Sequence, residues 1–151
     1  MLVYMWAASQ KQIVTPAAVM VNGTIVFTIT GGPILIVELL STCITANDTT
    51  ASTLQWQSVP TTGTATVFTG ATATLASATA GTVVRLNPTA LSTAPDIVTA
   101  AAGGVVLGAN VSNRIIVKNG TIKTVIGVGS TTGTWTHALY YQPLTPDSLV
   151  N

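Results

Sequence analysis

The chain has 151 residues, and only 6% of them are Asp, Glu, Lys or Arg, against roughly 25% in an ordinary soluble domain. Its net charge of +1 excludes a strongly basic or acidic surface, and 28 threonines supply much of the polarity instead. Because a nearly neutral surface repels its neighbours weakly, the composition predicts an assembly component in contact with other copies or with another protein.

The length fits one domain with a core of its own, and the single cysteine excludes an intramolecular disulfide. Cys43 has apolar neighbours, Leu40 and Ile44, so a buried and unreactive thiol is expected there. The first residues lack the basic segment of a secretory signal, so no signal peptide is predicted.

Residues 1–20 are predicted to form an extended N-terminal arm. Large apolar residues occur there without the period of a strand or helix, and Pro16 interrupts them. Apolar residues in such a stretch usually need a partner surface, so Tyr4, Met5 and Trp6 are the candidate interface residues. The alternative is a short strand or a helical turn that folds onto the same domain.

Two Asn-Gly pairs predict β-hairpins. Asn22-Gly23 and Asn119-Gly120 are each flanked by β-branched residues. Asn-Gly readily adopts the two positive φ angles of a type I′ turn, which joins neighbouring antiparallel strands. Each pair is therefore expected to link two strands that hydrogen-bond to each other.

The most apolar stretch, residues 25–44, is nominally long enough to cross a bilayer. However, Gly31-Gly32-Pro33 interrupts it, and Glu38 would lie in the hydrocarbon. Two strands are therefore predicted instead of a membrane helix, and the chain is not expected to bind a membrane. The second strand is apolar on both faces, which is typical of the centre of a sandwich.

The rest of the chain is also predicted to be β-structure. A half-buried strand is expected at residues 53–59, because Trp56 alternates with polar residues there, and a final strand at 134–144 has Trp135, Leu139 and Tyr141 on one face. Weak strands are expected at 64–69 and 72–75, and a further strand at 82–87. A total of about eight to ten short strands without an amphipathic helix predicts an all-β domain over residues 21–151, either a β-sandwich or a jelly roll.

Catalytic and metal-binding groups are scarce. The four carboxylates are far apart in the sequence, and His137 is the only histidine. On a strand His137 shares the face of Trp135 and Leu139, so a core or interface histidine is expected instead of a general base. One cysteine and one histidine without ligand spacing predict no metal site, and no phosphate-binding loop is present. The chain is therefore expected not to be an enzyme and to need no cofactor.

The only cluster of basic residues consists of Arg114, Lys118 and Lys123. It contains no interleaved aromatic residues, so a solvated strand face is expected there and no nucleic-acid partner.

Threonines also recur two residues apart, at Thr28/Thr30, Thr64/Thr66, Thr72/Thr74 and Thr134/Thr136. Residues i and i+2 share a strand face, so these steps could form a flat hydroxyl surface for ice or glycans. The alternative is threonine as the ordinary polar residue of exposed strands, and the irregular spacing favours it.

Two segments, Thr28-Ile-Thr-Gly-Gly-Pro-Ile-Leu-Ile and Trp135-Thr-His-Ala-Leu-Tyr-Tyr-Gln-Pro-Leu, frame a middle rich in Thr, Ala, Gly and Val. Over most of residues 22–146 this pattern resembles small virion proteins of tailed bacteriophages, in which a TGGP-like turn and an aromatic closing strand frame a β-sandwich. The resemblance implies a capsid decoration (cement) protein that binds the outer surface of a phage head and stabilises the shell. It further implies the major capsid protein and sister copies in a homotrimer as partners, a place on the virion surface, and synthesis in the host cytoplasm.

Other functions remain open at this stage. A head-fibre or tail-associated protein would show the same pattern. A carbohydrate-binding β-sandwich would need exposed aromatic residues, for which Trp56, Trp135, Tyr140 and Tyr141 are the candidates. A hydrolase would depend on His137.

Overall fold

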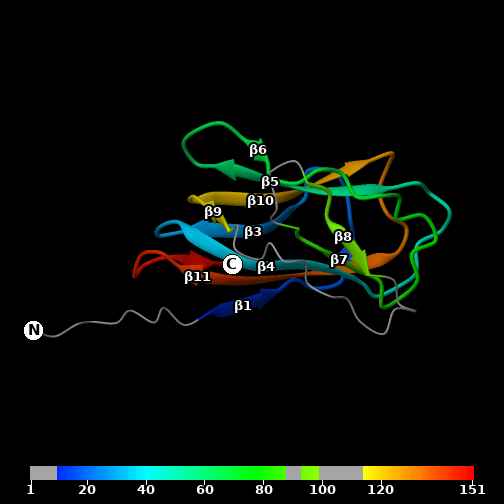
Figure 1. Ribbon diagram of the computed structural model, residues 1–151, viewed down its shortest axis with the longest axis horizontal. Coiled ribbons are helices and arrows are strands. Elements are labelled where there is room, and N and C mark those ends of the chain that lie inside the picture. Colours follow the sequence, from blue (N-terminus) through cyan, green and yellow to red (C-terminus); the bar gives the residue numbers. More distant parts are fainter. Residues whose placement is uncertain (1–9, 88–92, 99–113) are drawn as a thin grey trace, which may run out of the picture.

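Alternating apolar and polar residues build two antiparallel β-sheets that pack face to face (Figure 1). This computed structural model describes residues 10–87, 93–98 and 114–151. Every regular secondary-structure element in those ranges is a β-strand. The predicted all-β fold and β-sandwich are therefore confirmed, whereas the jelly roll and the extended arm stay predictions.

Seven strands form the first sheet, in the order β1-β11-β4-β7-β8, with β2 beside β11 and β9 beside β4. Their bounds are β1 (Lys11–Val14), β2 (Ala18–Val19), β4 (Ile34–Cys43), β7 (Val83–Arg85), β8 (Asp96–Val98), β9 (Ile115–Val117) and β11 (Thr134–Pro143). The long pair β4–β11 lies at the centre, with Leu39 opposite Leu139. The described half of the predicted arm belongs to this sheet, because β1 and β2 both pair with β11.

Five strands form the second sheet, in the order β12-β3-β10-β5-β6. Their bounds are β3 (Ile25–Thr30), β5 (Thr53–Pro60), β6 (Thr66–Val67), β10 (Gly120–Gly127) and β12 (Leu149–Val150). The chain crosses between the sheets at most of its corners, so strands that follow each other in sequence mostly face each other across the core.

The inner faces of the two sheets share one apolar core. Trp56 on β5 and Trp135 on β11 are fully buried, as their alternation predicts. The two strands predicted within residues 25–44 are also confirmed, as β3 and β4. Within the described ranges, no helix is long and apolar enough to span a membrane.

Both predicted Asn-Gly hairpins are wrong. Gly23 has a φ of +80° and Gly120 a φ of +143°, but neither Asn22 nor Asn119 has a positive φ, so neither corner is a type I′ turn. β2 and β3 belong to different sheets, and so do β9 and β10. Each corner therefore carries the chain across the core. β-branched residues on both sides of each pair suit strands in a hairpin and in a crossing alike, so the local pattern does not distinguish the two arrangements.

The corner between β3 and β4 packs against the C-terminal segment. Gly31 has a φ of +72°, and a Cβ atom there would overlap the backbone carbonyl of Asp147. Thr145 Oγ1 donates a hydrogen bond to the Gly31 carbonyl (3.2 Å), and Ser148 Oγ donates to the Pro33 carbonyl (2.8 Å). Glycine is therefore required here both by the backbone conformation and by the close approach of the chain.

Threonine hydroxyls complete one side of β5. The strand predicted at 72–75 is absent, yet the Leu54 N–H donates to Thr72 Oγ1 (2.9 Å) and the Trp56 N–H donates to Thr69 Oγ1 (3.1 Å). Both threonines are buried. Their hydroxyl oxygens take the place of the carbonyl groups that a full neighbouring strand would offer.

The same interaction recurs at other strand ends. The Met20 N–H donates to Thr131 Oγ1 (2.9 Å), and the His137 N–H donates to Thr15 Oγ1 (2.9 Å). In each case the acceptor comes from a distant part of the chain. Of the predicted Thr-x-Thr steps, only those on β3 and β11 lie wholly within strands, so the four steps do not form one hydroxyl surface.

Replacing Thr72 with valine tests this role of the hydroxyl. Thr72→Val keeps the shape but leaves the buried Leu54 N–H without its acceptor, so we expect the free energy of unfolding to fall by about 1–3 kcal/mol in urea titrations. Thr28→Val is the matched control, on the outer face of β3, and should change stability by less than about 0.5 kcal/mol. Thr72→Ser should recover most of the loss, and equal effects of both valine substitutions would contradict this account.

Candidate interaction surface

His137 is a core residue with only 5% of its surface exposed. It faces inward from β11, directly across from Ser41 of β4, and its Nδ1 lies 2.6 Å from Ser41 Oγ. Burial lowers the pKa of His137 from 6.5 to about 4, because the charged imidazolium loses its hydration. The prediction of a core histidine is confirmed. Ser41 is fully buried, so its oxygen is not accessible to a substrate in this conformation.

Cys43 is buried next to this pair, as predicted. Its thiol donates to the Thr45 carbonyl oxygen (3.2 Å), and burial raises the pKa of the thiol. A raised pKa keeps the sulfur protonated and weakly nucleophilic. Within the described residues, no three His, Cys, Asp or Glu side chains gather closely enough to hold a metal ion.

The candidate glycan-binding aromatics do not form an exposed groove. Trp56 and Trp135 are fully buried, and the Trp135 indole N–H donates to Asn47 Oδ1 (3.1 Å). Tyr141 is buried, and its hydroxyl accepts a hydrogen bond from the Val150 N–H (3.3 Å). Only Tyr140 is partly exposed, so the four residues cannot stack together on a sugar.

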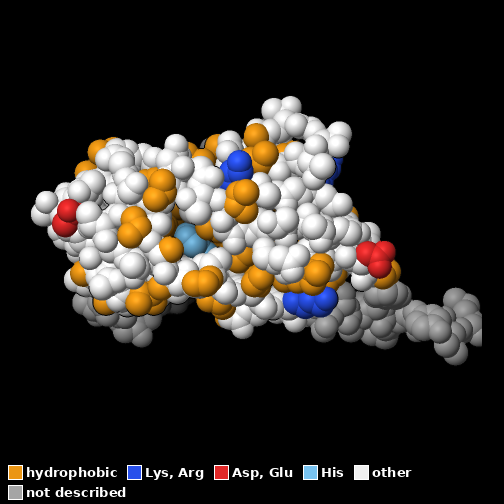
Figure 2. Space-filling view, turned by 180° about the vertical axis from the view of Figure 1, so that it is seen from behind, with side chains coloured by type: hydrophobic (Ala, Val, Ile, Leu, Met, Phe, Trp, Pro, Cys, Tyr) orange, Lys and Arg blue, Asp and Glu red, His pale blue; other side chains and the backbone are white. Residues whose placement is uncertain are grey.

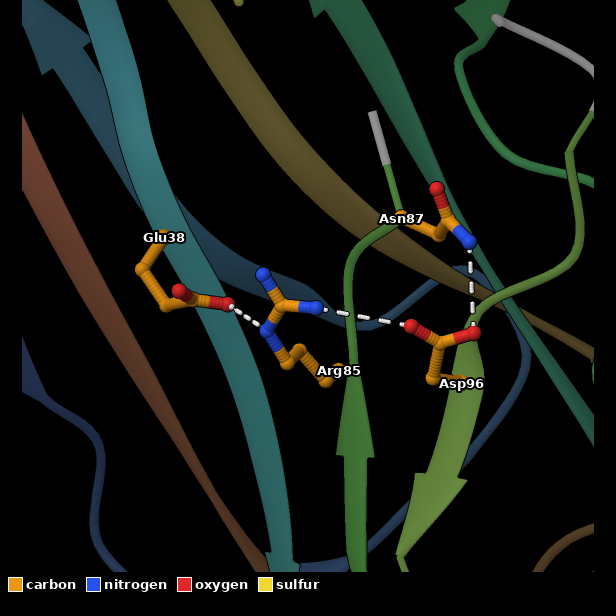
Figure 3. A network of polar contacts seen from close by, with 4 residues as sticks. All are labelled: Glu38, Arg85, Asn87 and Asp96. Carbon is orange, nitrogen blue, oxygen red and sulfur yellow. Dashed lines mark hydrogen bonds and ion pairs between the residues drawn. The ribbon is translucent and has the colours of Figure 1, made fainter. Parts of the chain in front are cut away.

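Three charged side chains form a network on the outer face of the first sheet (Figure 3). Arg85 of β7 lies between Glu38 of β4 and Asp96 of β8, with Nε 2.8 Å from Glu38 Oε1 and Nη1 3.4 Å from Asp96 Oδ2. Asn87 Nδ2 donates to Asp96 Oδ1 (3.2 Å). The Arg85 side chain is only 12% exposed, so these contacts join three strands in a partly dehydrated place.

The sequence alone does not predict this network. Burial raises the pKa of Glu38 more than the attraction of Arg85 lowers it. A carboxylate within an apolar strand requires a partner, and this was the available signal. The face on which Glu38 lies, and so its partner, could not be identified from the sequence. A register shift between β4 and β11 places Glu38 opposite Tyr140 while Ile36 lies opposite Tyr141, which breaks the simple alternation of faces along β4. Such a bulge cannot be located from residue alternation alone.

The outer face of the second sheet is nearly free of charge. Its five strands contain one charged residue, Lys123, which lies between Gln57 of β5 and Ile25 of β3. Two positions along β10, Thr121 lies next to Val59. Besides Lys123 and the exposed Leu149 of β12, this face consists mainly of threonine, glutamine and β-branched side chains. The other two residues of the predicted basic cluster, Arg114 and Lys118, are exposed beside β9, as expected for solvated charges.

An apolar hollow of about 350 Å³ opens between the sheets near β2 and the start of β3. The residues that line it include Pro16, Val19, Met20, Val26, Trp135 and His137. Figure 2 shows the histidine, in pale blue, among hydrophobic side chains on this side of the molecule. Of the residues that line the hollow, Val19 and Ile25 are 40% and 52% exposed, so large apolar side chains lie at its opening.

The predicted interface residues Tyr4, Met5 and Trp6 lie outside the described residues. Comparisons with protein-family models, with curated proteins and with solved structures found no match to this chain. The fold and the surfaces described above are therefore the basis for the functional assignment.

The buried histidine predicts a specific loss of stability in acid. Its neutral form contributes fully above pH 6.5, and this contribution falls as the pH drops from 6.5 towards the folded-state pKa of about 4. At about 1.36 kcal/mol per pKa unit, the loss approaches about 3 kcal/mol below that pKa. Urea unfolding at about pH 7.5 and about pH 4 should show a smaller acid loss in His137→Asn, which offers Ser41 a partner but does not titrate.

Glu38 has the opposite effect on stability in the same pH range. Its pKa is raised in the folded protein, so it adds stability as the pH falls. Its contribution is present in both proteins and cancels in their comparison. Identical acid losses in the wild type and His137→Asn would contradict the assignment of a buried neutral imidazole.

Proposed function

We propose that this chain is a virion structural protein, a decoration protein that binds the outer surface of a phage head and stabilises the shell. In this proposal it acts as a homotrimer with the major capsid protein as its partner. The supporting observation is the outer face of the second sheet, whose five strands carry Lys123 as their one charged residue. Such a face suits permanent contact with another protein.

The mechanism would be interface burial. Hydroxyl and amide groups cost less to remove from water than charges, provided that they find hydrogen-bond partners. A face with a single charge also brings few like charges together across a contact. Interfaces above about 1,000 Å² are typically persistent, and a trimer that engages three sites at once gains avidity. Many such contacts would resist expansion of the shell.

Light scattering and co-sedimentation test this proposal. We expect the purified chain to be a trimer and to co-sediment with expanded heads assembled from the proposed partner, the major capsid protein. Thr121→Glu adds a charge to the outer face of the second sheet and should weaken co-sedimentation at least ~10-fold. Thr61→Glu, in the exposed turn after β5, is the matched control and should leave it unchanged.

A monodisperse monomer that does not co-sediment with heads would contradict the proposal. Co-sedimentation with isolated tails or fibres in place of heads would also contradict the decoration role, although not a structural role in the virion. Equal effects of Thr121→Glu and Thr61→Glu would show that the second sheet is not the docking face.

A further inference from the structure

The hollow beside β2 has a lining that suits an apolar occupant. Its volume of about 350 Å³ is within the range of about 300–1,000 Å³ that is usual for ligand-sized sites. Val19 and Ile25 in its lining expose apolar surface, and contiguous apolar surface of this kind marks an interaction site. The single titratable group that lines it is His137, whose pKa of about 4 keeps the ring neutral near pH 7.

The chain contains a segment with matching chemistry. Residues 1–9, MLVYMWAAS, have no charged side chain and include Tyr4, Met5 and Trp6. Tyrosine and tryptophan bury large apolar areas and still place a polar group at the edge of a contact. The hydroxyls of Thr15 and Thr24 line the hollow beside its apolar wall and suit such a group.

The direction of β1 separates this segment from the hollow of its own copy. β1 runs antiparallel to β11, with Lys11 opposite Tyr141 and Val14 opposite Ala138. The hollow lies beyond the Val14 end of β1, next to Thr15, whereas residues 1–9 join the sandwich at the Lys11 end.

To enter its own hollow, the segment would have to reverse direction within a few residues. The sequence before β1, Ala-Ala-Ser-Gln at positions 7–10, contains no Gly, Pro, Asn or Asp, and its one turn-forming residue, Ser9, favours a tight turn only weakly. A neighbouring copy placed beyond the Lys11 end of β1 could receive the segment without such a reversal.

We propose that residues 1–9 of one copy fill the hollow of a second copy, with Trp6 as the central anchor. This inference rests on the self-association in the proposed function and identifies the contact that holds the copies together. A head-to-tail exchange of this kind closes into a ring if the rotation between copies permits, which fits a trimer. The trimer contact then lies at the edge of the sandwich and leaves the outer face of the second sheet free for the shell.

Disulfide trapping between two separately made variants tests the exchange. Ala7→Cys places a thiol beside Trp6, and Val19→Cys places one at the rim of the hollow. We expect oxidation of the mixture to give a covalent dimer at least ~10-fold faster than a mixture of Ala7→Cys with Ile116→Cys. Ile116 is the matched control, since it is 61% exposed and lies far from the hollow. It belongs to β9, which pairs with the Ile34 end of β4, whereas the hollow lies near the Cys43 end. The native Cys43 is buried and stays silent.

Adding Trp6→Ala to the Ala7→Cys chain should abolish the preference for Val19→Cys. Equal rates with Val19→Cys and Ile116→Cys would overturn the inference. A chain that carries both Ala7→Cys and Val19→Cys provides a second criterion, because a concentration-independent crosslink within one copy would also overturn it.

The result is separable from the proposed function. If trapping fails while the chain still co-sediments with heads, the exchange of residues 1–9 is wrong and the decoration role stands. If trapping succeeds and heads are not bound, the copies associate as inferred but the proposed partner is wrong.

Discussion

Hydrogen bonds from backbone N–H groups to threonine hydroxyls are the interaction on which the rest of this fold depends. Short strands and frequent crossings between the sheets leave many backbone donors without a neighbouring strand. Thr72 accepts such a donor from β5, Thr131 from the residue after β2, and Thr15 from β11. An unpaired buried N–H group costs about as much as a lost hydrogen bond, so these hydroxyls allow short strands to close a complete core.

Side chains that can make several hydrogen bonds or ion pairs join separate segments of the fold. Asn47 is the clearest case: its Oδ1 accepts from the Gly133 N–H (3.0 Å) and from the Trp135 indole N–H (3.1 Å), while its Nδ2 donates to the Leu75 carbonyl (2.9 Å). One buried amide thereby ties three segments together. Arg85 does the same for β4, β7 and β8 on the outer face of the first sheet. The fold therefore needs few charges, since neutral groups make most of its polar contacts, and under the proposed function the nearly neutral surface is covered by a partner.

The sequence was sufficient for the features that depend on local alternation. Trp56 and Trp135 indicate the buried faces of β5 and β11, and Gly31 indicates the break between β3 and β4. It was not sufficient for features that depend on which strands become neighbours. Asn22-Gly23 and Asn119-Gly120 suit a tight turn in either case, and the choice between hairpin and crossing is made by packing across the core.

At the candidate surfaces, too, local alternation could be predicted from the sequence, whereas contacts between distant strands could not. The burial of His137 could be predicted from its parity with Trp135, but its bond to Ser41 required the register of β4 against β11. The hollow beside β2 is formed by segments more than a hundred residues apart in sequence, and no local pattern indicates it. Threonine was read as an ordinary exposed strand residue, because composition does not show which hydroxyls are buried as acceptors.

Amide hydrogen exchange measured by NMR at individual residues tests the central claim most directly. The N–H groups of Leu54, Trp56 and Met20 donate to threonine hydroxyls and not to a strand. If these hydroxyls close the fold, the three amides should exchange as slowly as the Ile122 amide at the centre of β10. Exchange of all three at the rate of exposed turn amides, with Ile122 still protected, would contradict the account.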